Sequence, residues 1–143
     1  MDGDRPKVLL IDDDRVVLSM YGDYLKKHGI SVVSAESGED GLSKIIEDDK
    51  IDLVVTDIMM ARMSGWALLD YIREELELDE VRMPVIVMSA VESVDLDMEY
   101  MRHGANDWVA KPIRPMAKLV HKIRKLLGLG VGLEDSSDDD DNG

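Results

Sequence analysis

Residues 53–60 read Leu53-Val54-Val55-Thr56-Asp57-Ile58-Met59-Met60, and this short stretch sets the pattern for the whole chain. A run of β-forming residues ends abruptly in the carboxylate of Asp57, and Ser64-Gly65 follows within eight residues. The pattern predicts a buried strand that delivers one acid to the loop at its carboxyl end. Because aspartate is also an ordinary turn residue, the weight given to Asp57 depends on what the other strands deliver to the same edge.

Short apolar runs recur along the chain and alternate with longer amphipathic segments. Further strands are predicted at residues 8–11, 30–33, 85–88 and 107–110. Helices are predicted between the strands and after the last one. Five strands that alternate with five helices imply right-handed crossovers, and therefore an α/β doubly wound domain whose parallel sheet is covered on both faces.

The spacing of apolar residues predicts the buried face of each helix. In chain order, the predicted faces are Val16, Met20 and Tyr24; Leu42, Ile45 and Ile46; Leu68, Leu69, Ile72 and Leu76; Leu96, Met98 and Met101; and Met116, Leu119, Val120, Ile123, Leu126 and Leu127. Ser37 and Ser64 are expected to cap the second and third helices. The fourth helix is expected over roughly residues 94–103, followed by a glycine cap.

The chain of 143 residues carries a net charge of −14, and this charge is unevenly distributed. Every Lys and Arg lies at or before Lys125, whereas six acids follow it, so the body carries −8 and the tail −6. Residues 134–143 of this tail contain no apolar residue and are expected to be disordered. Residues 6–128 are therefore predicted to form one domain, followed by a flexible glycine-rich and acidic tail at residues 129–143.

Composition and charge narrow the classes of partner and location. A surface this negative disfavours direct binding to nucleic acid, because the phosphates repel it. No apolar run approaches the roughly 18 residues that span a bilayer, and the N-terminus lacks the basic and apolar regions of a signal peptide. The chain has no cysteine, which excludes disulfides and thiolate metal sites. We expect a cytoplasmic protein that contacts neither membranes nor nucleic acids.

Polar residues follow four of the five predicted strands. The first strand ends at Asp12 and Asp13, the third at Asp57, the fourth at Ser89 and the fifth at Lys111. In a parallel doubly wound sheet these ends lie along one edge, around the crevice where the strand order reverses. We therefore expect three carboxylates, one hydroxyl and one ammonium to lie together.

This set of groups suits phosphoryl transfer to a carboxylate. Three carboxylates in one crevice raise one another's pKa unless a cation neutralises them, and an all-oxygen site favours Mg²⁺. A carboxylate is a competent nucleophile toward phosphorus. The Lys111 ammonium, the Ser89 hydroxyl and Mg²⁺ would stabilise the charge that develops on the phosphoryl oxygens.

The same residues carry a resemblance to a known family. The Asp12-Asp13 pair, Asp57, Ser89-Ala90, Gly104-Ala105 and Lys111-Pro112 occur in the order and with the spacing of a response-regulator receiver domain of two-component signalling. The resemblance covers residues 6–128. It implies a five-stranded sheet in the order 2-1-3-4-5 with five helices, a flavodoxin-like fold similar to that of chemotaxis regulators.

The resemblance also implies a role for each site residue. Asp57 would accept a phosphoryl group from a sensor histidine kinase or a histidine phosphotransfer protein. Asp12, Asp13, Asp57 and the backbone carbonyl of Met59 would hold Mg²⁺. Ser89 and Lys111 would contact the phosphoryl group, and the peptide bond between Lys111 and Pro112 would be cis. Such a protein catalyses only its own phosphorylation and dephosphorylation, so it is not an enzyme in the usual sense.

In the family, phosphorylation moves the serine and an aromatic residue and alters the surface of the fourth helix, fifth strand and fifth helix. The corresponding residues here are Ser89 and Trp108, and the larger indole is expected to hinder a simple inward rotation. A second departure is Ala61, where the family usually has proline. The altered surface would bind a downstream protein target, or an output domain that the given sequence does not contain.

Two alternatives remain open at the level of sequence. Asp12-Asp13-Asp14-Arg15-Val16 also matches the nucleophile motif of haloacid-dehalogenase-like phosphatases, in which Asp12 would be phosphorylated. The chain is short for that family and would leave Asp57 without a role. The second alternative is an interaction module that has the receiver fold but switches independently of phosphate.

Overall fold

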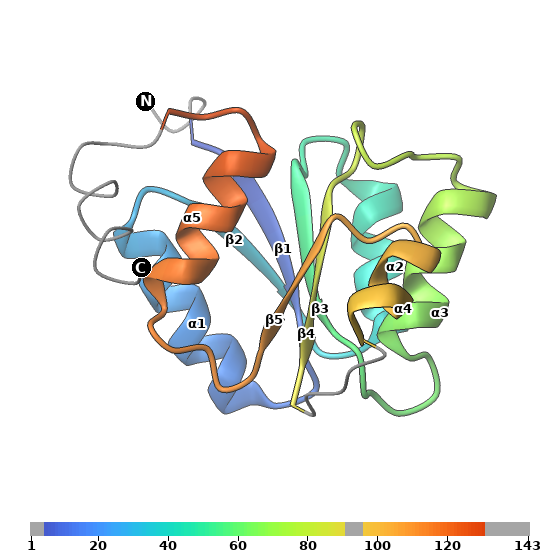
Figure 1. The fold of residues 1–143 in the computed structure, drawn as a ribbon, viewed down its shortest axis with the longest axis horizontal. Coiled ribbons are helices and arrows are strands. Elements are labelled where there is room, and N and C mark those ends of the chain that lie inside the picture. Colours follow the sequence, from blue (N-terminus) through green and yellow to red (C-terminus); the bar gives the residue numbers. More distant parts are fainter. Residues whose placement is uncertain (1–4, 91–95, 131–143) are drawn as a thin grey trace.

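The computed structural model describes residues 5–90 and 96–130, which build one five-stranded parallel sheet (Figure 1). The strands lie in the order β2-β1-β3-β4-β5, which confirms the prediction. Their bounds are β1 (Lys7–Ile11), β2 (Ser31–Ala35), β3 (Leu53–Asp57), β4 (Val85–Ser89) and β5 (Asp107–Ala110). β2 therefore begins one residue later and ends two residues later than expected.

The register of the strands sets the ends of the central strands level with one another. Asp57, the last residue of β3, pairs with Met88 of β4, and Ser89 pairs with Ala110 at the end of β5. Ile11 at the end of β1 pairs with Thr56, one residue before Asp57. The residues that follow these strands are therefore delivered to one edge of the sheet.

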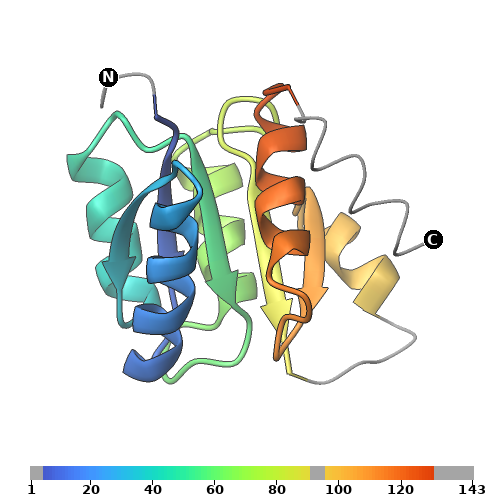
Figure 2. The same ribbon diagram turned by 90° about the vertical axis from the view of Figure 1, so that its left-hand side faces the viewer.

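Helices cover both faces of the sheet, as Figures 1 and 2 show. α1 (Arg15–Lys27) and α5 (Ala117–Leu126) lie on one face, and α2 (Gly38–Glu47), α3 (Gly65–Asp70) and α4 (Leu96–Arg102) lie on the other. α3 continues as a short π-helix, η2 (Tyr71–Glu75), which the sequence pattern did not predict. β1 begins and α5 ends at the same edge of the sheet, opposite the edge where the strands end (Figure 1).

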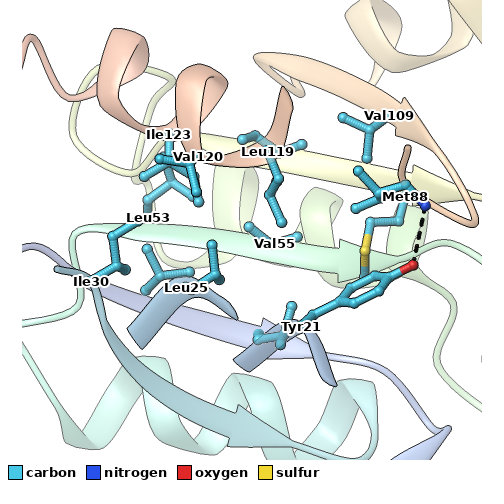
Figure 3. Packing of buried hydrophobic residues seen from close by; sticks show 14 of the residues in the cluster. Tyr21, Leu25, Ile30, Leu53, Val55, Met88, Val109, Leu119, Val120 and Ile123 are labelled. Atoms are coloured by element: carbon cyan, nitrogen blue, oxygen red, sulfur yellow. Dashed lines mark hydrogen bonds between the residues drawn. The ribbon is translucent and has the colours of Figure 1, made fainter. Parts of the chain in front are cut away.

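The apolar core forms two clusters, one on each face of the sheet. The cluster under α1 and α5, drawn in Figure 3, contains Leu25, Val55, Met88 and Leu119. The Tyr21 hydroxyl lies in this cluster and accepts a hydrogen bond from the backbone N–H of Ile113, at 3.2 Å. The other cluster lies under α2, α3 and α4. A sheet that is buried on both faces explains why its strands read as continuous apolar runs.

Two predicted helix faces were wrong. In α1 the residues that face the sheet are Leu18, Tyr21, Gly22 and Leu25, whereas Val16 and Met20 are exposed and Tyr24 is half-buried. Both stripes have helical spacing. The buried stripe places Gly22 against β2, where an added Cβ would lie 3.8 Å from Val32 Cγ1. It also places the Tyr21 hydroxyl beside a backbone N–H.

The predicted face of α4 was also wrong. Met98 and Met101 are 66% and 69% exposed, whereas Tyr100 is half-buried and packs against the core. The side chain of Leu96, the third residue of the predicted face, lies outside what the structure describes. The prediction relied on the apolar character of methionine and did not count the aromatic ring between the two. Within α2, Ile45 is buried as predicted but Ile46 is exposed. The predicted faces of α3 and α5 hold, with Leu68, Leu119 and their neighbours buried.

Parts of two predictions fall where the structure gives no description. The expected start of the fourth helix, at residue 94, lies outside the described residues, and so do residues 131–143 of the expected tail. The boundary between the domain at residues 6–128 and the tail at residues 129–143 stays a prediction. Within the described residues, none of the helices is both long and apolar enough to cross a membrane.

Candidate functional site

The edge where the strands end brings three carboxylates together. Carboxylate oxygens of Asp12, Asp13 and Asp57 all lie within 4.8 Å of one another. Asp12 and Asp57 are buried, whereas Asp13 is exposed. The three carboxylates lie together, as predicted from the strand-end positions, and the cluster is open to solvent on the side of Asp13.

Lys111 joins two of these carboxylates. It follows β5 directly, and its Nζ lies 2.7 Å from Asp12 Oδ2 and 3.3 Å from Asp57 Oδ2. Its backbone N–H donates to the carbonyl of Ser89 at 2.8 Å, which fixes the chain beside the end of β4. The peptide bond that follows, Lys111–Pro112, is cis, and so is Arg114–Pro115, which the sequence did not predict.

Three consecutive acids, Asp12, Asp13 and Asp14, lie in the turn from β1 into α1 and have different roles. Asp12 is held by its backbone N–H, which donates to the carbonyl of Ala35, and its Oδ1 accepts from the N–H of Asp14. Asp14 is the N-cap of α1, and its carboxylate accepts from the N–H groups of Val16 and Val17. Because Asp14 caps the helix, Asp12 and Asp13 are left for the cluster.

The electrostatics of the site follow from burial and from like charge. The pKa of Asp57 is raised because burial disfavours the carboxylate and Asp12 repels it, and the hydrogen bond and charge of Lys111 offset this only in part. Burial alone would lower the pKa of Lys111, but its hydrogen bonds to and attraction by Asp12 and Asp57 outweigh burial and raise it. Three acids therefore share one ammonium among the described residues of the cluster, which leaves about two negative charges unbalanced.

The loop after Asp57 packs closely on the end of β3. A Cβ on Gly65 would overlap the carbonyl oxygen of Asp57, so only glycine fits at the start of α3. The Gly65 N–H donates to the carbonyl of Ile58 at 2.8 Å, and the Thr56 hydroxyl donates to the carbonyl of Asp57 at 3.0 Å. Sequence reasoning missed the role of Thr56, although Ser64-Gly65 already marked the turn.

The same loop is tied to the start of α2. Arg62, whose φ of 66° is unusual for a residue other than glycine, has its Nε 3.1 Å from Glu39 Oε2. A Cβ on Gly38 would lie 2.9 Å from the Cβ of Met63, so the two segments touch closely. These contacts hold the loop that carries Met59, the residue whose side chain is largely exposed two positions after Asp57. Sequence reasoning did not find them.

The two residues of the expected switch lie on neighbouring strands. Ser89 ends β4 and is buried, beside the end of β5. Trp108 of β5 pairs with Val87 of β4. It is half-buried against the core cluster under α2, α3 and α4. Val109, the next residue, faces the opposite cluster. The alternation of the strand therefore directs Trp108 toward the side of α4.

The chemistry of the donor set fits a hard divalent cation. All three side chains offer carboxylate oxygens, and the buried pair lacks a full complement of positive charge. Mg²⁺ binds such sites through one or two carboxylates and completes its six ligands with water, for which the exposed side at Asp13 leaves room. Fold and site together thus define a doubly wound α/β domain with an acidic cluster, whose oxygen donors fit a divalent cation, at the carboxyl ends of its strands.

Comparisons with known proteins identify the family of this domain. The chain matches the sequence profile of the response regulator receiver domain over residues 8–124. Response regulator protein FleR of Pseudomonas aeruginosa is 35% identical over 129 residues, which are 90% of this chain and 26% of FleR. Two-component response regulator ORR3 of Oryza sativa subsp. indica is 32% identical over 121 residues, which are 83% of this chain and 91% of ORR3.

Solved structures agree with this match. The receiver domain of the Francisella response regulator 1452 superposes with a TM-score of 0.79 at 28% sequence identity, over 87% of this chain and 98% of that domain. The chain belongs to the response regulator receiver domain family of two-component signalling. It spans about a quarter of FleR but nine-tenths of ORR3, so its relatives include both longer proteins and proteins of similar length.

Proposed function

We propose that Asp57 accepts a phosphoryl group from a sensor histidine kinase or a histidine phosphotransfer protein, in a reaction that depends on Mg²⁺. The observation that supports this most directly is the position of Lys111, whose Nζ lies 3.3 Å from Asp57 and 2.7 Å from Asp12. An ammonium at this distance can contact an oxygen of the incoming phosphoryl group while Asp57 acts as the nucleophile.

In the proposed reaction a carboxylate oxygen of Asp57 forms a bond to phosphorus as the bond between phosphorus and the donor's imidazole nitrogen breaks. The electron pair of that bond stays on the leaving imidazole, and Asp57 becomes an acyl phosphate. Lys111 and the Ser89 hydroxyl contact the phosphoryl oxygens, where the negative charge develops. A water molecule later attacks phosphorus, which releases phosphate and restores the carboxylate.

Asp12, Asp13, Asp57 and the backbone carbonyl of Met59 are the proposed ligands of Mg²⁺. When bound, the ion neutralises the carboxylates and the oxygens of the transferred group. The contacts of Arg62 and Met63 with α2 support this role for Met59, because they fix the loop in which its carbonyl lies. The raised pKa of Asp57 supports it as well, since the buried acids lack compensating charge.

The proposed output is a change in the surface formed by α4, β5 and α5. A phosphoryl group adds close to two negative charges and three acceptor oxygens beside Ser89. Movement of Ser89 toward the group would change the space available to Trp108, which lies on the α4 side of the sheet. Met98 and Met101 are exposed on α4 and offer adaptable apolar contacts to a downstream protein or output domain.

The phosphodonor is proposed to approach across the start of α1. Val16 and Met20 are exposed on one face of this helix, which begins two residues after Asp13. Met59 is exposed beyond the end of β3. Large apolar side chains around the mouth of a charged site are typical of an interaction surface.

The chain is proposed to act in the cytoplasm and to turn over only its own phosphoryl group. Its family is one of signalling regulators rather than enzymes. A phosphatase that uses Asp12 as nucleophile is not favoured, because the chain matches the receiver domain family and Asp12 is fully buried. An interaction module that ignores phosphate is not favoured either, since the carboxylates and the lysine occupy one cluster.

Incubation with Mg²⁺ and a small phosphodonor, followed by intact mass measurement, tests the proposal. We expect the mass to rise by one phosphoryl group in the native protein and not in Asp57→Asn. Asp49→Asn, which changes an exposed acid outside the cluster, is the matched control and should be phosphorylated like the native protein. Phosphorylation that persists in Asp57→Asn and disappears in Asp12→Asn would favour the phosphatase alternative.

A further inference from the structure

α5 is the most basic of the described helices, in a chain whose net charge is −14. Residues Ala117–Leu126 contain three lysines, one arginine and no acid. Lys118, Lys122 and Lys125 are spaced by four and then three residues, so their side chains share one face of the helix. Leu119 and Ile123 are fully buried against the sheet. The face that carries the three lysines, called here the basic face of α5, therefore lies away from the core.

The basic face of α5 is only partly neutralised by the described part of the chain. Lys122 Nζ lies 2.9 Å from Asp107 Oδ2 of β5. Lys118 and Lys125 are exposed, and neither forms an ion pair with an acid of residues 5–90 or 96–130. Figure 2 shows α5 on the outside of the domain, with no other described helix or strand over its outer side. The face is therefore open to an anionic ligand.

The chain that leaves α5 turns back beside the helix. Gly128 has a φ of 69°, and the N–H of Leu129 donates to the carbonyl of Arg124 at 2.9 Å. The side chain of Arg124 then holds Gly130, because its Nε and Nη2 donate to the Gly130 carbonyl at 3.1 and 2.6 Å. Gly130 thus lies beside the last turn of α5, and the residues that follow start next to the helix instead of beyond its end.

The sequence that follows carries the opposite charge. Residues 134–141 contain six acids and no cation: Glu134, Asp135, Asp138, Asp139, Asp140 and Asp141. The four residues from Gly130 to Glu134 can extend over about 13 Å. Ten helical residues rise about 15 Å, so the acids can reach every turn of α5. A short flexible connection also gives an effective concentration in the millimolar range, which is enough to fill a weak site.

We propose that residues 134–141 dock on the basic face of α5 of the same chain and cover Lys118 and Lys125. The attraction acts between charges near the surface and does not require the segment to fold. It is strong at low ionic strength and is screened at about 1 M salt, where the Debye length falls to about 3 Å. The end of α2 is a poor alternative site, because Glu47, Asp48 and Asp49 lie there and repel the segment.

The docked segment regulates access to α5. This consequence rests on the proposed function, in which α4, β5 and α5 form the output surface. A partner that binds α5 first has to displace the acidic segment, so the segment lowers the affinity for such a partner. The docking itself involves no phosphoryl group and is measured on unphosphorylated protein with a chelator. Failure of the docking leaves the proposal for Asp57 untouched, and failure of phosphorylation leaves the docking untouched.

Zero-length carbodiimide crosslinking, which joins a carboxylate to an amine in direct contact, tests the proposal on the full chain. We expect peptide mapping to find residues 134–141 linked to Lys118 and Lys125 at low salt, with these links lost at about 1 M NaCl. Lys50 is the internal control, since it is exposed and follows α2. Equally frequent links to Lys50, or links that are insensitive to salt, would overturn the proposal.

An equal mixture of ¹⁵N-labelled and unlabelled chains shows whether the contact is made within one chain. We expect links between peptides of the same label only. A predominance of links that join a labelled to an unlabelled peptide would mean that the segment binds a second copy, which would overturn docking within the chain.

NMR spectra of charge variants supply a second measurement. We expect the amide resonances of residues 134–141 to shift in the double variant Lys118→Gln and Lys125→Gln. The matched control is the double variant Lys50→Gln and Arg82→Gln, which removes two exposed cations elsewhere and should leave these resonances in place. Shifts of the same size in both variants would indicate a general effect of net charge and would contradict docking on α5, as would no shift in either.

Discussion

Lys111, directly after β5, reaches past the end of β4 to Asp57 at the end of β3, with Nζ 3.3 Å from Oδ2. The same nitrogen lies 2.7 Å from Asp12 Oδ2, at the end of β1. One ammonium thus serves two buried carboxylates that the register of the sheet brings together. The stability of the domain and the chemistry of its site therefore depend on the same charges.

Replacing Lys111 by methionine should destabilise the domain in the absence of metal. The substitution leaves Asp12 and Asp57 buried without their cation, and we expect a loss of about 2 kcal/mol in the free energy of unfolding. Added Mg²⁺ should recover part of the loss, because it neutralises the same carboxylates. Urea unfolding with EDTA and with Mg²⁺ measures both effects. Lys122→Met, which breaks a more exposed pair with Asp107, should cost less than about 1 kcal/mol; an equal loss in the two variants would refute the argument.

Asp57→Asn should stabilise the metal-free domain at neutral pH. Burial and the charge of Asp12 raise the pKa of Asp57 in the folded state above its unfolded value. The native protein therefore loses stability as the pH rises through the folded pKa, while the asparagine variant does not. We expect a gain on the order of 1 kcal/mol at pH 7 that vanishes below the unfolded pKa. Urea unfolding in EDTA across this pH range measures it, and a gain of the same size at low pH would exclude ionisation of Asp57 as its cause.

Asp13→Asn should weaken Mg²⁺ binding and leave the metal-free domain almost as stable as before. Asp13 is exposed, so its charge contributes little to folding, but its carboxylate belongs to the cluster of three. The rise in melting temperature on addition of Mg²⁺ should be smaller in this variant, by mass action on a weaker site. Asp23→Asn removes an exposed acid of α1 outside the cluster and should bind Mg²⁺ like the native protein. Unchanged Mg²⁺ stabilisation in Asp13→Asn would remove this residue from the ligand set.

Gly65→Ala should be costly, whereas Gly22→Ala should be tolerated. A Cβ at residue 65 would overlap the carbonyl oxygen of Asp57 and push the acceptor strand away from α3, with an expected cost of about 1–3 kcal/mol. At residue 22 the added carbon meets only Val32, at 3.8 Å, and alanine favours the helix by about 1 kcal/mol. Thermal unfolding of both variants measures these two effects on stability. The phosphorylation rate should fall in Gly65→Ala alone, and an equal rate in the two variants would show that Gly65 does not position Asp57.

The carboxylate cluster could be predicted because it depends on strand ends, which the sequence marks clearly, whereas the order of the strands followed only from the resemblance to receiver domains. Val55 and its neighbours form a continuous apolar run that stops at Asp57, and Leu10 and Ile11 stop in the same way before Asp12. In a parallel sheet every such stop falls at one edge. The distances of Lys111 to its two partners then follow from the register.

The faces of α1 and α4 could not be predicted in the same way, because two apolar stripes competed. In α1 the stripe that contains Tyr21 and Leu25 is buried in place of the one that contains Val16 and Met20. The choice depends on a partner far along the chain, the N–H of Ile113. Arg73 likewise makes long-range hydrogen bonds that leave no local signal in the sequence: its Nε donates to the carbonyl of Gly104 at 2.9 Å.

The start of β1 and the end of α5 lie at the same end of the domain, opposite the carboxylates (Figures 1 and 2). A fluorescent reporter, an affinity tag or a surface tether joined before β1 or after α5 would therefore be kept a full strand length away from Asp57. Immobilisation through either point leaves the acidic edge facing the solvent, so phosphodonors and metal ions can be exchanged over a captured layer of the protein while α4 is still free to meet a binding partner.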